Sequence, residues 1–207
     1  MHLSKTDIKS LAHSFRLNLI NSITGIKPVH LIGTISKTGL SNLAIFSSIF
    51  HLGSKPDLIG FITRLDDSKQ TYRNILETGL YTLNHVHASF VERAHYTSAK
   101  FSSAQSEFDA CHLTEEKIND FNAPFVKESK LKIGMNYLES VPINANDTVM
   151  VIGEINNITL IDKVLNDAGL IDLEQSQVMG VTGFNAYYGL KKMKEYPYAK
   201  VDQLPKF

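Results

Sequence analysis

Two polar stretches carry residue types with which a protein could hold a phosphorylated, ring-shaped ligand. The first runs from Gly33 to Ser48 and places hydroxyls, an amide and small residues around the turn Lys37-Thr38-Gly39. Small residues let backbone N–H groups approach a ligand closely, and a flat heterocycle with polar edges needs such a rim. An ordinary polar hairpin has the same composition, so this stretch alone leaves both interpretations open.

The second stretch lies between Thr63 and Asn74. Arg64 follows an apolar run, and Ser68 and Lys69 precede a segment with the composition of a short helix. A helix N-terminus with hydroxyls and a cation favours a phosphate group. A helix cap with solvated lysines explains the same residues when the stretch is taken by itself.

Other reactive side chains give weaker signals. His85 and His87 alternate on an expected strand and would face one side, but no nearby carboxylate completes a metal set, so no metal site is predicted. Cys111 is the single cysteine and has no adjacent cation, which predicts an inert thiol. Tyr187 and Tyr188 suit either stacking on a ring or packing at an interface. Dinucleotide, P-loop, zinc-protease and nucleophile-elbow motifs are absent from the sequence.

Composition narrows the class of protein. The chain has 207 residues, 43% of them hydrophobic, with 21 basic and 21 acidic side chains. A neutral chain without a cluster of basic residues lacks the positive charge that binding to nucleic acid or to an anionic membrane requires. A basic leader and an apolar run long enough to span a bilayer are also missing. We therefore expect a soluble, cytoplasmic protein that binds neither nucleic acid nor membrane.

Periodicity and turn residues predict mostly strands. The expected helices are 4–20, 71–77 and 89–95, and the expected strands are 29–36, 44–52, 58–63, 81–86, 131–141 and 148–160. Residues 97–129 look irregular, and the end of the chain is aromatic. Sequential strands with inserted helices indicate a closed or partly closed barrel rather than a doubly wound sheet.

Several segments of the sequence, taken in their order along the chain, resemble the flavin reductase-like family of FMN-binding split barrels. The matching segments are Ile32-Gly33-Thr34, Asn42-Leu43-Ala44, Pro56-Asp57-Leu58-Ile59, Thr71–Ile75, Glu77–Asn84, Ser106–Thr114 and Val151–Ile155. The resemblance covers about residues 20–190 and rests on order and spacing rather than on one motif. His112 stands where the family usually has Gly, Asp57 stands where a second Pro is common, and the N-terminal helix and the tail 184–207 are less typical.

The resemblance implies one domain over residues 1–207. It would be a mainly β, Greek-key split barrel with a core at about 20–190, decorated by the N-terminal helix and the aromatic tail. It also implies a homodimer with the flavin at the seam, to which tail aromatics or His85 of the other subunit could contribute. The implied contacts to the ring and ribityl chain are Thr34, Ser36, Asn42, Leu43, Ala44, Phe46, Ser47 and Ser48. Those near the phosphate are Thr63, Arg64, Lys69 and Thr71, with Asn74 orienting their loop.

The function implied by the resemblance is an FMN-dependent oxidoreductase. It would take a hydride from NADH or NADPH and pass electrons to a flavin or another small acceptor. We name no catalytic side chain, because the flavin carries the chemistry. FMN is expected rather than FAD because the sequence offers a single phosphate loop. Two alternatives stay open: a non-catalytic flavin carrier or sensor of the same fold, and a small-molecule-binding barrel without flavin.

Overall fold

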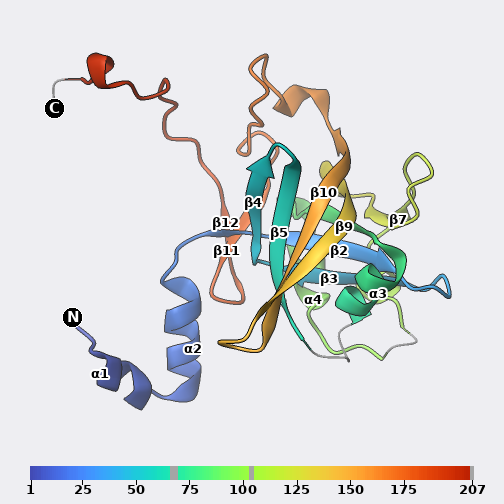
Figure 1. Cartoon of the computed structure of the whole chain (residues 1–207), viewed down its shortest axis with the longest axis horizontal. Coiled ribbons are helices and arrows are strands. Elements are labelled where there is room, and N and C mark those ends of the chain that lie inside the picture. The colour runs from blue at the N-terminus through green and yellow to red at the C-terminus, as the bar shows by residue number, and fades with distance from the viewer. Residues whose placement is uncertain (66–69, 103–104, 206–207) are drawn as a thin grey trace.

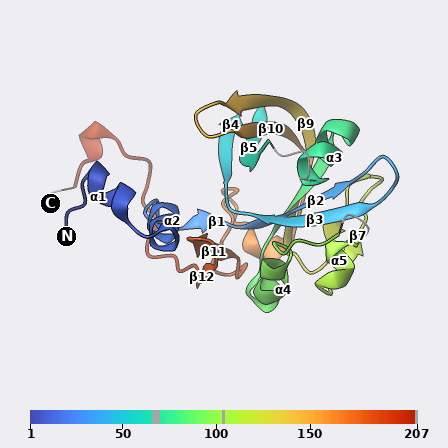
Figure 2. The ribbon, with the colours of Figure 1, turned by 90° about the horizontal axis from the view of Figure 1, so that it is seen from below.

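A seven-stranded antiparallel sheet forms the body of the protein. The computed structural model describes residues 1–65, 70–102 and 105–205. The strands follow the order β3-β2-β6-β9-β10-β5-β4 and curl into a barrel (Figures 1 and 2). Their bounds are β2 His30–Ile35, β3 Ser41–Phe46, β4 Ile49–Ser54, β5 Asp57–Arg64, β6 Leu80–His85, β9 Leu131–Ile143 and β10 Thr148–Leu160. The expected mainly β barrel is confirmed.

The barrel is split between its edge strands β3 and β4. These strands follow each other in the chain and are joined by Ser47 and Ser48, but each pairs with a different neighbour, β2 and β5. Ser48 secures the crossing, because its hydroxyl donates to the carbonyl of Ile62 at 2.7 Å and its carbonyl accepts from the N–H of Ile62 at 3.3 Å. The continuous strand expected at 44–52 is therefore two strands, broken where the chain changes partner.

Smaller elements surround the barrel. A three-stranded sheet contains β1 Lys27–Pro28, β11 Met179–Thr182 and β12 Ala186–Gly189, and β7 Glu115–Glu116 pairs with β8 Phe125–Val126. The helices are α1 Lys5–Ser10, α2 His13–Ser22, α3 Gln70–Thr78, α4 Val91–Tyr96 and α5 Glu107–Ala110, with 3₁₀ turns η1 Ala88–Phe90, η2 Asp162–Val164 and η3 Val201–Gln203. Within the described ranges, no helix is long and apolar enough to cross a membrane.

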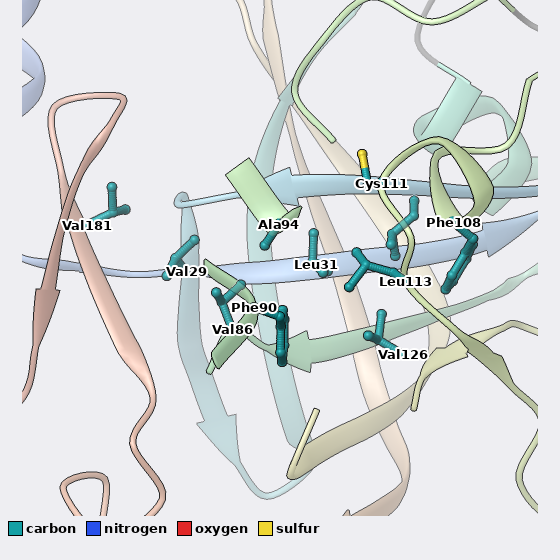
Figure 3. Close-up of a cluster of buried hydrophobic side chains, with 11 residues drawn as sticks. Val29, Leu31, Val86, Phe90, Ala94, Phe108, Cys111, Leu113, Val126 and Val181 are labelled. Carbon is teal, nitrogen blue, oxygen red and sulfur yellow. The ribbon is translucent and has the colours of Figure 1, made fainter. Parts of the chain in front are cut away.

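Side chains alternate along β2 between two hydrophobic cores. Ile32 faces the barrel interior with Phe61, Tyr81 and other large apolar residues. Leu31 faces outward into a second core, where it packs with residues from α4, α5 and β11, as Figure 3 shows. A strand that is buried on both faces consists of consecutive apolar residues, and this is why the strand at residues 29–36 is easily recognised in the sequence.

The N-terminal helix differs most from expectation. In place of one helix over 4–20 the chain forms α1 and α2, interrupted at Leu11-Ala12, where both residues take extended ψ values of 146° and 140°. Neither helix buries a residue. The apolar spacing that predicts a helix is present, and α2 lies beside the barrel and away from both cores (Figure 1).

Candidate functional site

A pocket of about 340 Å³ lies between the end of β3, helix α4 and the β11–β12 hairpin. Its walls are mostly apolar, and its few polar groups come from α4, the hairpin and Ser47. The lining residues are Val29, Ile45, Phe46, Ser47, His95, Ser98, Val181, Phe184, Asn185 and Tyr187. Apolar walls with a small number of placed polar groups are typical of sites for small molecules and cofactors.

The main chain of β3 adds hydrogen-bonding groups at the pocket's rim. β3 is an edge strand, and the N–H of Leu43 points away from β2 and donates to Glu107 Oε2 at 3.0 Å. Because alternate residues of a strand direct their N–H groups to the same side, the N–H and C=O of Ile45 also point outward along this edge. Ile45 lines the pocket. The rim therefore offers main-chain donors and acceptors to the polar edge of a planar ligand.

Tyr187 and His95 meet at the pocket wall. The hydroxyl of Tyr187 lies 2.9 Å from His95 Nδ1, and the two rings pack edge to face with centroids 5.7 Å apart. Partial burial raises the pKa of Tyr187. This contact ties the β11–β12 hairpin to α4. The sequence pointed to Tyr187, but it missed His95, Phe184 and Asn185, which have no local motif.

Four of the expected site residues converge in a buried network at the other end of β3. Asn42 Nδ2 donates to Thr71 Oγ1 at 3.0 Å and to Thr34 Oγ1 at 3.3 Å, and Asn74 Nδ2 donates to Thr34 Oγ1 at 3.1 Å. All four side chains are buried, and Asn74 Oδ1 has no hydrogen-bond partner among the residues that the structure describes. The network fastens α3 to β2 and β3, and so it fixes the N-terminus of α3.

The remaining expected residues separate into two groups. Phe46 and Ser47 line the pocket, and Arg64 is exposed at the end of β5, two residues beyond the Ile62 that pairs with Ser48. In contrast, Ser36 bonds to Thr38 in the β2–β3 turn, at the far end of β3 from the pocket.

The side chains of Leu43 and Ala44 also lie apart from the pocket. Leu43 is buried in the outer core, and Ala44 pairs with Ile32, whose side chain faces the barrel interior. Thr63 is buried in β5. Lys69 lies outside the described residues.

His85, His87 and Cys111 pack within the fold and do not form a shared reactive site. His85 packs against His30 with ring centroids 4.0 Å apart, whereas His87 Nδ1 accepts from the N–H of Ser89 and caps η1. The two strand histidines therefore do not share a site. Cys111 is buried in the outer core, and burial raises the pKa of its thiol, in keeping with an inert cysteine.

Comparison with known proteins identifies the family. Residues 26–178 match the family described as flavin reductase like domain. A Shewanella frigidimarina protein, named as a candidate flavin reductase with a split barrel domain, is 43% identical. The match covers 96% of this chain and 100% of that one, with a TM-score of 0.93.

Two further proteins are similar to this chain at lower identity. An uncharacterised Aquifex aeolicus protein is 28% identical over 81% of this chain and 88% of its own length. The flavoredoxin of Desulfovibrio vulgaris, 21% identical, shares the fold with a TM-score of 0.75 over 96% of this chain and 98% of its own. The chain thus belongs to the flavin reductase like domain family, and its barrel is the split barrel of that family.

Proposed function

We propose that this chain binds FMN and transfers reducing equivalents from NADH or NADPH to a flavin or another small acceptor. The observation that carries the proposal is the pocket beside the free edge of β3 at Ile45, Phe46 and Ser47, in a chain that belongs to this family. When bound, the flavin supplies reversible uptake of a hydride. Each turnover would oxidise one NADH or NADPH and add two electrons to the acceptor.

The pocket fits the ring of a flavin in size and chemistry. Its volume of about 340 Å³ falls within the range of small-molecule sites. Apolar side chains such as Val29 and Val181 suit the faces of a planar ring, and the outward main chain of Ile45 suits its polar edge. Main-chain N–H donors at that edge also stabilise negative charge on the ligand atoms that they contact.

The phosphate would lie at the end of β5. Arg64 is exposed there, close to the Ser47-Ser48 crossing that borders the pocket. Helix α3 is the next element after Arg64 in the chain, and the buried network of Asn42 and Asn74 holds its N-terminus in place. A fixed helix N-terminus and an exposed guanidinium each favour a phosphate group.

The nicotinamide would stack directly on the ring. The sequence has no dinucleotide motif of the kind that would hold NADH or NADPH in a site of its own. On the pocket's mouth, Phe184 is 58% exposed, which leaves that side accessible in a single chain. Hydride transfer requires the reacting atoms to approach within about 3–3.5 Å, and stacking achieves this.

Titration of the apo-protein with FMN and riboflavin tests the phosphate contact. A charge-assisted hydrogen bond contributes about 1.5–3 kcal/mol, so Arg64→Ala should weaken FMN binding by roughly ten- to a hundred-fold and leave riboflavin binding unchanged. Lys37→Ala is the matched control, because Lys37 is exposed in the β2–β3 turn, far from the pocket. Equal losses for both ligands would exclude a phosphate contact at Arg64.

Anaerobic mixing tests the electron donor. The flavin absorbance of the FMN-loaded protein should bleach within minutes with NADH or NADPH. A band that stays oxidised with both donors, yet bleaches with dithionite, would reject the reductase function and leave a flavin carrier. A purified protein that binds no flavin would reject both and leave a barrel for another small molecule.

A further inference from the structure

The pocket wall carries two side chains that can each donate and accept a proton. Tyr187 comes from β12 and His95 from α4, and both line the pocket. The Tyr187 hydroxyl lies 2.9 Å from His95 Nδ1. Both side chains are half-buried, and neither has a second hydrogen-bond partner within the part of the chain that the structure describes. The contact joins the hairpin to the helix, but two side chains that cannot exchange protons would join them equally well.

The number of polar hydrogens on the pair decides what it can offer to a ligand. A neutral tyrosine and a neutral histidine carry one each, and one of these is used in the bond between them. If Tyr187 donates to His95 Nδ1, the hydrogen on Nε2 is left, and if Nδ1 donates to Tyr187, the phenolic hydrogen is left. In either arrangement the pair keeps one donor.

The pair can also replace a proton that it has given away. When the phenolic hydrogen of Tyr187 moves to a ligand, His95 Nδ1 can supply another while Nε2 takes one from water. Imidazole is suited to this exchange because it gains and loses protons near neutral pH. Partial burial raises the pKa of Tyr187, so its hydroxyl keeps its proton until a ligand takes it. At the pocket's mouth Phe184 and Asn185 are exposed, and water can therefore reach this side.

A bound flavin would leave this pair available to a second molecule. In the function proposed above, the polar edge of the ring lies along the main chain of Ile45 on β3, whereas the pair belongs to the walls formed by α4 and β12. The acceptor would stack on the ring after the nicotinamide has left. It would then lie among apolar side chains such as Val181 and Phe184, within reach of the pair.

A proton donor at this place distinguishes two classes of acceptor. Electron carriers such as a free flavin or a metal complex can be reduced without a proton from the protein. A double bond conjugated to a carbonyl group takes up a hydride readily only if the carbonyl oxygen, on which negative charge develops, is stabilised or protonated. The mostly apolar walls suit the hydrocarbon part of such a compound, and the pair supplies the donor that its oxygen needs.

We propose that Tyr187 and His95 protonate the acceptor, and that the acceptor is a small conjugated enone. The proposal rests on the proposed function, which supplies the hydride. The hydride adds to the alkene carbon farther from the carbonyl group, the electron pair of the double bond moves to the carbonyl oxygen, and the pair donates a proton to that oxygen. The resulting enol returns to the saturated carbonyl compound in water, and His95 regains a proton from water.

Reoxidation of the reduced protein measures the role of the pair. The FMN-loaded protein is reduced with one equivalent of dithionite and mixed anaerobically with benzylideneacetone, a conjugated enone, or with ferricyanide, which takes electrons alone. We expect the parent protein to saturate the double bond of the enone. A general acid contributes about a hundred-fold or more to a rate. Tyr187→Phe and His95→Gln should therefore each lower the ratio of the enone rate to the ferricyanide rate by about that factor.

Tyr188→Phe is the matched control. Tyr188 is the next residue of β12, so its side chain faces the other side of the strand, where it is 48% exposed. This variant should keep the parent's ratio of rates. A parent protein that ferricyanide reoxidises but that leaves the enone intact would overturn the proposal. An unchanged ratio in both Tyr187→Phe and His95→Gln would overturn it as well.

Binding of a stable anion tests the donor without turnover. The oxygen of p-nitrophenolate mimics the carbonyl oxygen on which charge develops, and nitrobenzene lacks that oxygen. A charge-assisted hydrogen bond changes an affinity by about ten- to a hundred-fold. The double variant Tyr187→Phe, His95→Phe should therefore bind p-nitrophenolate more weakly by that factor in the oxidised, FMN-loaded protein, and nitrobenzene should lose much less. Equal losses for both ligands would overturn the donor role.

The two proposals fail in different ways. Dithionite replaces NADH and NADPH in this assay. A protein that neither nicotinamide reduces, but that saturates the enone through the pair, would refute the proposed electron donor and support the role of Tyr187 and His95. Rapid reduction by NADH without any reaction of the enone would retain the reductase function and overturn the proposed acceptor. A chain that binds no flavin would overturn both proposals.

Discussion

Acidification should destabilise this protein through two histidines inside the barrel, His30, which is buried, and His85, which is half-buried. His30 on β2 is directly opposite His85 on β6, and their rings meet edge to face with centroids 4.0 Å apart. Burial lowers the pKa of His85 from 6.5 to about 4. Burial, and then the neighbouring His85, lowers the pKa of His30 well below 6.5. Both imidazoles are therefore neutral in the folded barrel at pH 7.

The size of the effect follows from the shift at His85. Between pH 6.5 and about 4 the unfolded chain binds a proton at this position that the folded chain does not, so folding stability falls as the pH falls through this range. At pH 5 this linkage removes about 2 kcal/mol of unfolding free energy relative to pH 7.5, and His30 adds a loss of the same sign. A loss of this size is a large share of a typical stability of about 5–15 kcal/mol.

Urea unfolding at pH 7.5 and pH 5 measures the effect. The chain has no tryptophan, so far-UV circular dichroism is the suitable signal. We expect His85→Phe, which keeps a planar ring beside His30, to lose about 2 kcal/mol less than the parent protein between the two pH values. His51→Phe, at an exposed position on β4, should show the parent's loss. Equal losses in the parent and in His85→Phe would refute a neutral imidazole with a lowered pKa at position 85.

Three further substitutions test the packing around the site. Gly33→Ala would place a Cβ 2.2 Å from the carbonyl oxygen of Pro124, so we expect a loss of about 3 kcal/mol or more in urea unfolding. Asn42→Ala removes the amide that donates to two buried threonine hydroxyls, and it should lower the unfolding free energy by about 2 kcal/mol in the same assay. Tyr187→Phe removes the hydrogen bond to His95 that ties the hairpin to α4. It should weaken FMN binding about five-fold in a fluorescence titration, and unchanged affinity would show that this tether does not shape the pocket.

The sequence predicted the regular part of the barrel well, because each strand there has its own local signal. β10 runs from Thr148 to Leu160, the range expected from its β-branched and apolar residues. α3 ends before Gly79, whose φ of +73° is the left-handed conformation that follows many helix ends. The order of strands in the sheet has no such local signal, and the family resemblance implied only the general type of barrel, a Greek-key split barrel.

The N-terminal helix shows the limit of periodicity. Apolar residues at helical spacing, such as Phe15 and Leu19, indicate that one face of a helix is covered, but they do not say by what. The resemblance placed this helix outside the core at about 20–190, as a decoration, and the structure leaves Phe15 exposed on α2. A sequence of one chain cannot distinguish a face that packs on its own core from one that packs on another molecule.

The strand β3 explains why the candidate site was predicted only in part. Residues along a strand alternate between two sides, so one polar motif is divided by the fold. Asn42 faces the barrel side of β3, where threonine hydroxyls satisfy its amide donors, whereas Ile45 presents its side chain and its outward main chain to the pocket. Buried polar groups are nearly always paired, and the partner of a polar side chain is not encoded next to it in the sequence. The motif therefore marks the correct strand, while the assignment of ligand contacts within it requires the register with β2 and the distant residues of α4 and β12.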